Sequence, residues 1–401
     1  MSKRKGLEGT FALNKKEAIH RWFAYMEGYS DALVEKELEL IGYEKIKTLY
    51  DPFGGSGTSL LTASKHDIKP YYSEINPVMG FICDTKINSV KSVKASYDKL
   101  NKIRNFFDYI NTKEFSYESE VDYQGFEKFY DIPQLSVLLQ ILDEIDNVDD
   151  DDVKNILYVA LASITVQVSK MIRRGDLRYA KDTEKNKVNQ NVKEVFLEKL
   201  EQIIADIEDQ EVVLHQEVTR LADDARNIEV ENVFDCVITS PPYLNGTNYI
   251  RNTKLELKLL RFVESEKDLP TLHSKGIIAG INNVSKRSHV EVLPCVESYI
   301  EELNPVTYDK RIPIMVAGYF FDMNNVIMKL SKAIKPNGYF IMDIGDSIFS
   351  GVHIPTHELL EKIAEMHGFE KYDEEILRVR HSNNGMKLSQ RVIRFKNIKE
   401  N

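Results

Sequence analysis

The stretch Asp51-Pro52-Phe53-Gly54-Gly55-Ser56-Gly57-Thr58 decides the fold. It follows a short β-prone run, 46–50, and a helical pattern begins directly after it. A second β-prone run, 69–73, ends at Glu74, so the segment predicts a βαβ unit with parallel strands. Glycines after such a strand let the backbone approach a ligand, and the helix that follows presents free N–H groups to it.

The glycine turn departs from three common motifs. The dinucleotide fingerprint needs a glycine at Leu60, the P-loop needs a lysine after its last glycine, and the hydrolase elbow needs a glycine at Thr58. By itself, Gly55-x-Gly57 is equally typical of a structural turn. Glu74 favours a ligand site, because an acid at the end of the second strand can accept hydrogen bonds from ribose hydroxyls. A surface acid is the alternative.

A second motif, Thr239-Ser240-Pro241-Pro242-Tyr243, follows the predicted strand 235–238. Two consecutive prolines remove two N–H donors and leave carbonyls without partners at the edge of the sheet where open α/β folds bind ligands. Such a loop can accept the hydrogens of an amino group, and Tyr243 adds a flat face for a base. The alternative is a rigid loop that caps a strand.

The remaining pattern predicts how these motifs are arranged. Helical spacing predicts two helices around a turn within 14–40 and a long helical segment over 85–209, in which the acids at 149–152 fit a helix start better than a calcium loop. Further strands are predicted at 212–218, 233–239 and 338–342, a helix at 354–367, and a closing hairpin from 375–379 and 391–395. We therefore predict an α/β fold with a mostly parallel sheet, helices on both faces, an antiparallel C-terminal hairpin and a helical insert.

Composition limits the class of protein. The chain has 401 residues and three cysteines, and Cys83, Cys236 and Cys295 form no CxxC pair, which indicates a reducing compartment and no structural metal. We see no signal peptide and no apolar run of membrane-spanning length, so we expect a cytoplasmic protein. The net charge of −10 counts, by itself, against a nucleic-acid partner, because Lys and Arg drive phosphate binding.

The two motifs together resemble motifs I and IV of the S-adenosylmethionine-dependent amino-group DNA methyltransferases, the N4-cytosine and N6-adenine family of TSPPY type. Residues 20–30 are similar to its motif X, 74–77 to motif II and 223–226 to motif III, and Asp346-Ser347 falls where later motifs lie. The resemblance implies a class I, Rossmann-like methyltransferase fold. It divides the chain into 1–84 (motif X and the first half of the cofactor domain), 85–209 (an unmatched helical insert, for target recognition or clamping) and 210–401 (the second half of the catalytic domain).

The resemblance also implies S-adenosyl-L-methionine as the cofactor, and it assigns residues to each part of it. The methionine part is assigned to Asp51, Phe53, Gly55, Gly57 and Thr58, and its outer end to Trp22, Tyr25, Gly28 and Ser30. Glu74 would take the ribose hydroxyls, Ile75 would lie against the adenine, and Asp224 would accept from the adenine amino group. Thr239 completes the cofactor-binding set.

The implied chemistry is methyl transfer to an exocyclic amine, whose lone pair is delocalised into the ring. Ser240 and the carbonyls of Ser240 and Pro241 would hold the amino hydrogens, Pro242 would stiffen the loop, and Tyr243 would stack on a flipped base. Ser240 favours N4-cytosine, whereas N6-adenine enzymes usually carry Asp or Asn there. Alternatives are N6-adenine, an RNA guanine-N2 methyltransferase and a catalytically silent DNA-binding relative. Cys295 lies too far past the fourth strand to act as a carbon-5 nucleophile.

Double-stranded DNA is the expected substrate, with a cognate restriction endonuclease as partner and neither a metal nor a membrane. Candidate DNA contacts are Arg173, Arg174, Arg178, Arg251, Lys286 and Arg287, with further basic residues at Lys170, Lys181, Arg378, Arg380, Lys387 and Arg391. Acids gather at 35–39 and 143–152, which we expect to lie away from the cleft. The sequence thus predicts one basic face on an acidic protein, in the cytoplasm of a prokaryotic cell and associated with the nucleoid.

Overall fold

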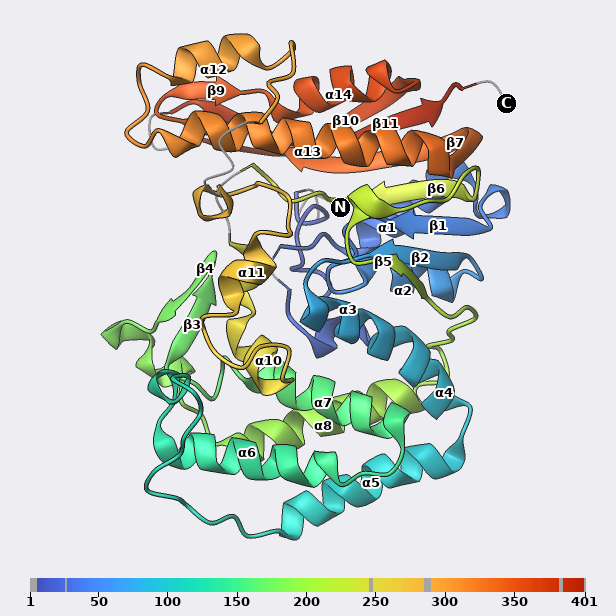
Figure 1. Ribbon diagram of the computed structural model, residues 1–401. Coiled ribbons are helices and arrows are strands. Elements are labelled where there is room, and N and C mark those ends of the chain that lie inside the picture. The colour runs from blue at the N-terminus through green and yellow to red at the C-terminus, as the bar shows by residue number, and fades with distance from the viewer. Residues whose placement is uncertain (1–5, 26, 245–247, 285–289, 382–384, 400–401) are drawn as a thin grey trace.

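The computed structural model describes residues 6–25, 27–244, 248–284, 290–381 and 385–399, and one sheet organises them (Figure 1). Its strand order is β10-β11-β7-β6-β1-β2-β5. The strands are β1 (Thr48–Asp51), β2 (Lys69–Ser73), β5 (Thr219–Ala222), β6 (Phe234–Thr239), β7 (Ile334–Gly345), β10 (Phe369–His381) and β11 (Lys387–Asn397). Neighbours from β5 to β7 pair in parallel, and β11 is antiparallel to both β7 and β10. The predicted mostly parallel sheet with an antiparallel C-terminal hairpin is confirmed.

Alternate residues of each strand face opposite sides of this sheet, and each side has its own hydrophobic core. On β6, Cys236 and Ile238 belong to one core and Val237 to the other. The first core includes α1 (Asp31–Ile41), α2 (Thr58–Lys65) and α3 (Pro77–Asp84). The second includes α12 (Glu297–Leu303), α13 (Arg311–Ala333) and α14 (Thr356–Met366). Helices therefore cover both faces, as the sequence predicts.

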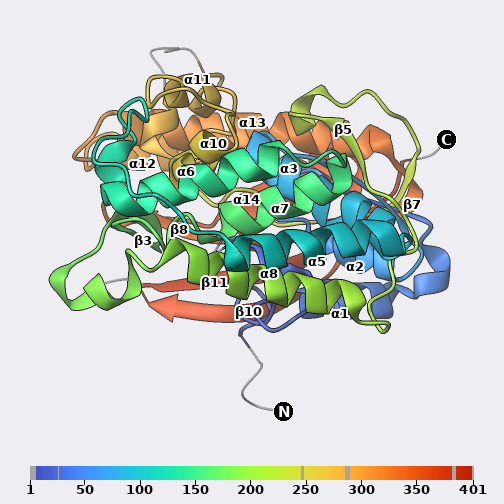
Figure 2. The same cartoon turned by 90° about the horizontal axis from the view of Figure 1, so that it is seen from below.

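The segment after α3 forms a helical layer below the sheet (Figure 1), and the view from below shows these helices in front (Figure 2). Its helices are α4 (Val90–Lys94), α5 (Tyr97–Thr112), α6 (Ile132–Asp146), α7 (Asp151–Ile164) and α8 (Val192–Glu208). Asp150 caps α7 by accepting from Val153 N at 3.1 Å, so the acidic run is a helix start. The sequence did not predict the hairpin of β3 (Met171–Arg174) and β4 (Asp176–Tyr179) within this segment.

The connection from β6 to β7 begins at the carboxyl end of β6, and its later helices, α12 and α13, belong to the second core. Its helices before α12 are short: α9 (Tyr249–Asn252), α10 (Lys254–Leu259) and α11 (Leu269–His273). A small hairpin, β8 (Ser347–Phe349) with β9 (Val352–Ile354), follows β7. In the part of the chain that the structure describes, no helix has the length and apolarity to span a membrane.

Two predictions of secondary structure were wrong. Before Gly28 the structure has turns and a single 3₁₀ turn, His20–Trp22, where we predicted a helix; Asp206 on α8 binds the backbone N–H of Ile19 at 2.9 Å, which fixes this segment locally. The predicted strand at 212–218 is also absent, and β5 begins at Thr219. Residues 212–218 bind the end of α2 instead of a neighbouring strand, since His215 N donates to Ser64 O at 3.0 Å.

Candidate functional site

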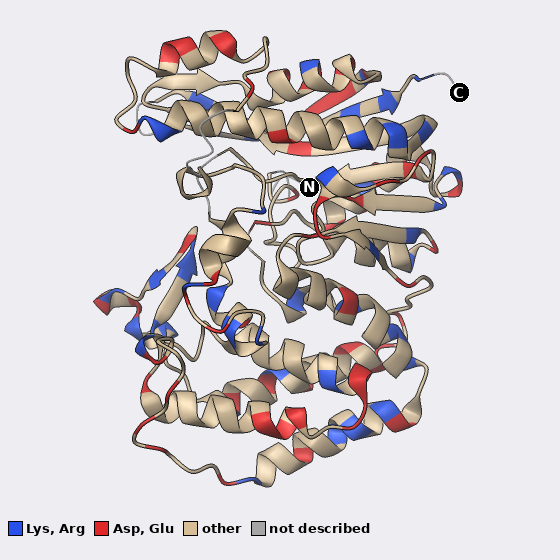
Figure 3. Ribbon diagram, in the orientation of Figure 1, with Lys and Arg blue, Asp and Glu red and all other residues tan. Residues whose placement is uncertain are grey.

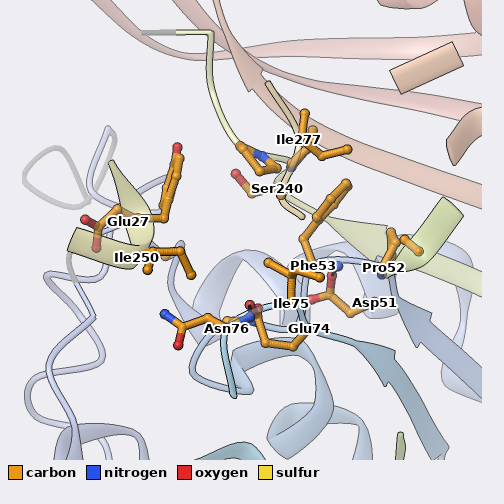
Figure 4. Close-up of a pocket in the computed structure, with 18 of the residues that line it drawn as sticks. Glu27, Asp51, Pro52, Phe53, Glu74, Ile75, Asn76, Ser240, Ile250 and Ile277 are labelled. Carbon is orange, nitrogen blue, oxygen red and sulfur yellow. Dashed lines mark hydrogen bonds between the residues drawn. The ribbon is translucent and has the colours of Figure 1, made fainter. Parts of the chain in front are cut away.

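A cavity with about 1040 Å³ of empty space, part of it open to solvent, lies at the carboxyl ends of β1, β2 and β6. Its lining includes the glycine turn, Glu74, Ile75, Asp224, and Ser240 to Pro242. Figure 4 shows Ser240 across the cavity from Glu74 and Asn76, with Phe53 between the two sides. The structure thus brings the two sequence motifs together in one cavity, at the edge where open α/β sheets bind ligands.

Two glycines give the turn after β1 its shape. Gly55 and Gly57 have φ of +51° and +81°, a region in which side chains are strained. At Gly57, a Cβ atom would lie 2.8 Å from the Sγ of Cys83. Gly54 N donates to Ser73 O at 3.0 Å, which fixes the turn to the end of β2. The turn therefore requires glycine, and α2 begins directly after it at Thr58.

Asp51, at the end of β1, joins the two motifs. Its carboxylate accepts from Thr239 Oγ1 at 2.7 Å, from Phe53 N at 3.0 Å and from the Tyr29 hydroxyl at 3.1 Å, and it also bonds Ser59. Burial raises the pKa of Asp51, and these donors oppose that rise. Because Thr239 precedes the Ser-Pro-Pro loop, Asp51 holds the start of the loop against the glycine turn.

Glu74, at the end of β2, is the carboxylate that the turn orients. Its Oε2 accepts from Gly55 N and its Oε1 from Asn76 N, both at 2.8 Å. Burial raises the pKa of Glu74 to about 7, although both N–H donors favour the ionised form. A half-buried carboxyl that lines a cavity and has a raised pKa is typical of a binding site.

Asp224 also lines the cavity, but its carboxylate already has partners. Oδ1 accepts from Arg226 N at 2.9 Å, and both oxygens accept from the Arg226 guanidinium, which also pairs with Asp322 on α13 at 2.6 Å. Asp223 is the more exposed of the two adjacent acids and pairs with Arg220 at 2.9 Å. Each oxygen of Asp224 thus already accepts from Arg226, although the side chain lines the cavity.

Beneath the Ser-Pro-Pro loop lies a residue that the motifs did not reveal, Asp343 of β7. The Tyr243 hydroxyl donates to its Oδ2 at 3.0 Å, and Gln390 Nε2 donates to both oxygens at 3.0 and 3.1 Å. Burial raises the pKa of Asp343 to about 7, and bonds from Gln390, Tyr243 and Ser240 oppose the rise. An acid inside an apolar strand run, 340–344, was the signal that could have found it.

Several predicted cofactor residues do not line this cavity. Trp22 is fully buried and donates from Nε1 to Asp206 Oδ2 at 2.8 Å, and Ser30 donates to Glu8 O at 2.9 Å. Both side chains are engaged within the fold, and neither lines the cavity, so their assignment to the cofactor stays a prediction. Gly57 and Thr239 support the site from behind the lining, while Tyr25 and Gly28 do line it.

The predicted basic residues have unequal surroundings. Arg173 pairs with Glu256 at 2.5 Å and Arg178 with Glu184 at 2.8 Å, whereas Arg174 lies 3.8 Å from Glu184 and its side chain is 60% exposed. Figure 3 shows acidic and basic residues interspersed along this hairpin and the helices below the sheet. Arg251 is exposed, and its guanidinium has no hydrogen-bond or ion-pair partner among the described residues. Lys286 and Arg287 lie outside the described residues.

Arg251 lines a second hollow, of about 1090 Å³, that adjoins the cavity and shares His273 and Asn283 with it. Lys254 and Glu266 lie on its wall and pair at 2.9 Å. Within the described ranges, no group of His, Cys, Asp or Glu side chains could hold a metal ion. Cys295 lies outside both linings, packed against the core on the α13 side.

The strand order, the glycine turn and the cavity define a class I, Rossmann-like methyltransferase fold. No family model matches the chain. Relatives with similar sequences are the Type II methyltransferase M.BsoBI of Geobacillus stearothermophilus, 27% identical over 94% of this chain and 84% of its own, and M.MvaI of Kocuria varians, 22% identical over 91% and 84%. M.AvaI of a Nostoc strain is 24% identical over 90% of this chain and 81% of its own. These relatives support a methyltransferase.

Among solved structures, the rRNA methyltransferase aviRa from Streptomyces viridochromogenes matches at a TM-score of 0.33 and 8% identity, covering 99% of this chain and 97% of that chain. A likeness of this size carries no argument, and the fold class rests on the strand order.

Proposed function

We propose that the protein transfers a methyl group from S-adenosyl-L-methionine to the N4 amine of a cytosine flipped out of duplex DNA. One observation carries the proposal: a single cavity holds both the Glu74 side of a nucleoside site and the Ser-Pro-Pro loop. The names of the Type II relatives support a modification enzyme of a restriction–modification system, with a cognate endonuclease as its functional partner.

The residues of the cavity fit the cofactor. Glu74 would offer a half-buried carboxylate to the ribose hydroxyls, Ile75 an apolar contact to the adenine, and Asp224 an acceptor for the adenine amino group. Tyr25, Gly28, Phe53, Gly55 and Thr58 line the part left for the methionine end. The bound cofactor supplies an electrophilic methyl group on a sulfonium. No metal is needed for such a transfer.

The Ser-Pro-Pro loop provides acceptors where the target amine must be held. Ser240 is half-buried in the cavity, and Pro241 and Pro242 bring no N–H donors that could pair with the loop's own carbonyls. Bonds from the two amino hydrogens to this loop would turn the nitrogen lone pair towards the methyl group. Asp343 would act as a positioning residue, because it fixes Tyr243 from below. Catalysis would then come from positioning and electrostatics.

The second hollow and the β3–β4 hairpin are the proposed approach of DNA. Asn252, at the end of α9, donates to Gly175 O at 2.7 Å and accepts from Leu177 N at 2.9 Å, so the hairpin is fixed to the segment that follows the catalytic loop. Arg251 and Arg174 provide exposed cations on these two elements. Segment 85–209 would therefore contribute to target recognition, with Arg251 and Arg174 contacting phosphates.

The most specific part of the proposal is the identity of the target base. Serine at position 240 favours N4-cytosine over N6-adenine, and the duplex substrate is preferred to RNA because the relatives are Type II methyltransferases. The experiment is to incubate the purified protein with duplex DNA or RNA and cofactor labelled in the methyl group, then identify the labelled nucleoside. Label in N4-methylcytosine is expected. Label in N6-methyladenine would overturn the base assignment, label only in RNA would overturn the DNA assignment, and no transfer would favour a silent relative.

A further inference from the structure

Lys86 is a buried cation that the proposed chemistry does not use. It lies on a π-helical turn, Thr85–Ser89, directly after α3, and is 1% exposed. Its Nζ donates to Ser56 O at 3.2 Å and to His20 O at 3.3 Å. No carboxylate of the described residues lies within ion-pair distance of it. Burial of an ammonium group without an opposite charge is costly, so this placement calls for a reason.

The contact with Ser56 places Lys86 behind the glycine turn. Ser56 belongs to the turn and lines the cavity, whereas Lys86 does not line it. The cavity wall is rich in acids, since its lining includes Glu27, Asp51, Glu74, Asp223 and Asp224 but only Lys275 as a cationic side chain. A carboxylate that enters this cavity would be repelled by the wall, and a cation close behind the turn would offset the repulsion.

We propose that Lys86 is a positioning residue for the cofactor's methionine carboxylate: it fixes the Ser56 carbonyl of the glycine turn and supplies positive charge to that end of the cavity. This inference rests on the proposed function, because it assumes that the cavity binds S-adenosyl-L-methionine. It assigns Lys86 to one end of the ligand only. The adenosine end, held by Glu74, should be indifferent to it.

The titration of Lys86 agrees with this role. Burial lowers its pKa to about 7, and the positive charge of Lys199 acts in the same direction. Burial keeps the Cys83 thiol neutral by raising its pKa and keeps His20 neutral by lowering its pKa. Lys199 is the other cation nearby, and burial lowers its pKa as well. A ligand carboxylate would favour the charged form of Lys86, so the two should stabilise each other.

The test compares two ligands that share adenosine and differ in the carboxylate. S-Adenosylhomocysteine carries the amino-acid end, and 5′-methylthioadenosine lacks it. Calorimetry should show that Lys86→Met weakens binding of S-adenosylhomocysteine on the order of tenfold, by loss of a charge interaction in a low-dielectric wall, and leaves 5′-methylthioadenosine within about twofold. Equal weakening of both ligands would overturn the inference, because it would make Lys86 merely structural.

The matched control is Lys94→Met, a half-buried lysine at the end of α4 whose Nζ, like that of Lys86, donates to two backbone carbonyls, Ile207 O and Asp209 O, and not to the turn. It should leave the affinity ratio of the two ligands unchanged. If Lys86→Met does not fold, the wild-type protein supplies the test: the preference for S-adenosylhomocysteine should decrease as pH rises through 7, because Lys86 loses its proton. Glu74 affects both ligands alike and cancels in the ratio. A ratio independent of pH would contradict the inference, whereas a wild-type protein that binds neither ligand would contradict the proposed function instead.

Discussion

Replacement of Glu74 by glutamine should weaken cofactor binding in a way that depends on pH. The carboxylate is half-buried at the cavity and accepts 2.8 Å bonds from Gly55 N and Asn76 N. Glutamine keeps one acceptor oxygen but places an amide NH₂ where the second N–H donor points. The variant therefore loses one charge-assisted acceptor for the ribose. Its amide NH₂ group also faces a backbone N–H group, so that two donors meet without an acceptor.

The size of the effect follows from these bonds. Hydrogen bonds to a charged group contribute about 1.5–3 kcal/mol each, so loss of one and weakening of its neighbour should cost about 2–3 kcal/mol, or roughly 30- to 150-fold in Kd. Burial raises the pKa of Glu74 to about 7, and two ribose donors would favour the ionised form. Wild-type affinity should therefore increase as pH rises towards 7 and level off above it. The glutamine variant should lack this contribution.

Titration calorimetry with S-adenosylhomocysteine between roughly pH 5.5 and roughly pH 8.5, on either side of the pKa of Glu74, measures both effects. Asp51 also lines the cavity and its pKa is raised by burial, so any pH dependence left in the variant reports on Asp51 and other groups. The reasoning about Glu74 is refuted if the variant binds as tightly as the wild type at about pH 8, or if both proteins show the same pH profile.

Three further predictions concern the loop, the DNA and the turn. Asp343→Ala should lower kcat about tenfold or more through loss of the Tyr243 contact, with cofactor affinity unchanged, because the residue positions the loop without lining the cavity; steady-state kinetics with a binding titration separates the two. Arg251→Gln should weaken DNA binding and reduce the slope of log K against log salt by about one, as measured by fluorescence anisotropy. Gly57→Ala should lower stability by about 1–3 kcal/mol in urea denaturation, because the new Cβ would lie in a strained region and 2.8 Å from Cys83 Sγ.

Each of these has a result that contradicts it. Asp343→Ala with normal kcat would show that Asp343 does not position the loop, and a change in cofactor affinity would show a wider structural effect. If the slope of log K against log salt is the same in the wild type and in Arg251→Gln, Arg251 does not contact DNA phosphates. For the turn, a Gly57→Ala variant as stable as the wild type would show that the turn tolerates a side chain.

The two motifs and the sheet could be predicted from sequence because their signals are local. Glycines after a β-prone run and prolines after another mark the carboxyl ends of parallel strands, and the strand order then brings them to one edge. The positions of Asp51, Glu74 and Ser240 on one cavity follow from these rules. The acids at 149–152 likewise begin a helix, because a cap requires only neighbouring residues.

What could not be predicted depends on contacts between distant segments. Asp206, which lies far along the chain on α8, accepts hydrogen bonds from Ile19 N and Trp22 Nε1, and the segment forms a 3₁₀ turn where a helix was expected. The acids at 35–39 were expected on an outer surface, yet Glu37 is buried and pairs with Arg394 of β11 at 2.7 Å. Likewise, no spacing rule relates Asp343 to the Ser-Pro-Pro loop.

The central claim is transfer to an exocyclic amine of a DNA base at this loop. The most direct measurement is nucleoside analysis, by mass spectrometry, of plasmid DNA from cells that express the wild-type protein or the Ser240→Ala variant, in a host without N4-methylcytosine. We predict N4-methylcytosine at one short sequence with the wild type, and its loss with the variant while S-adenosylhomocysteine binding persists. Unmodified amines in the wild-type DNA, or equal methylation by the variant, would contradict the claim.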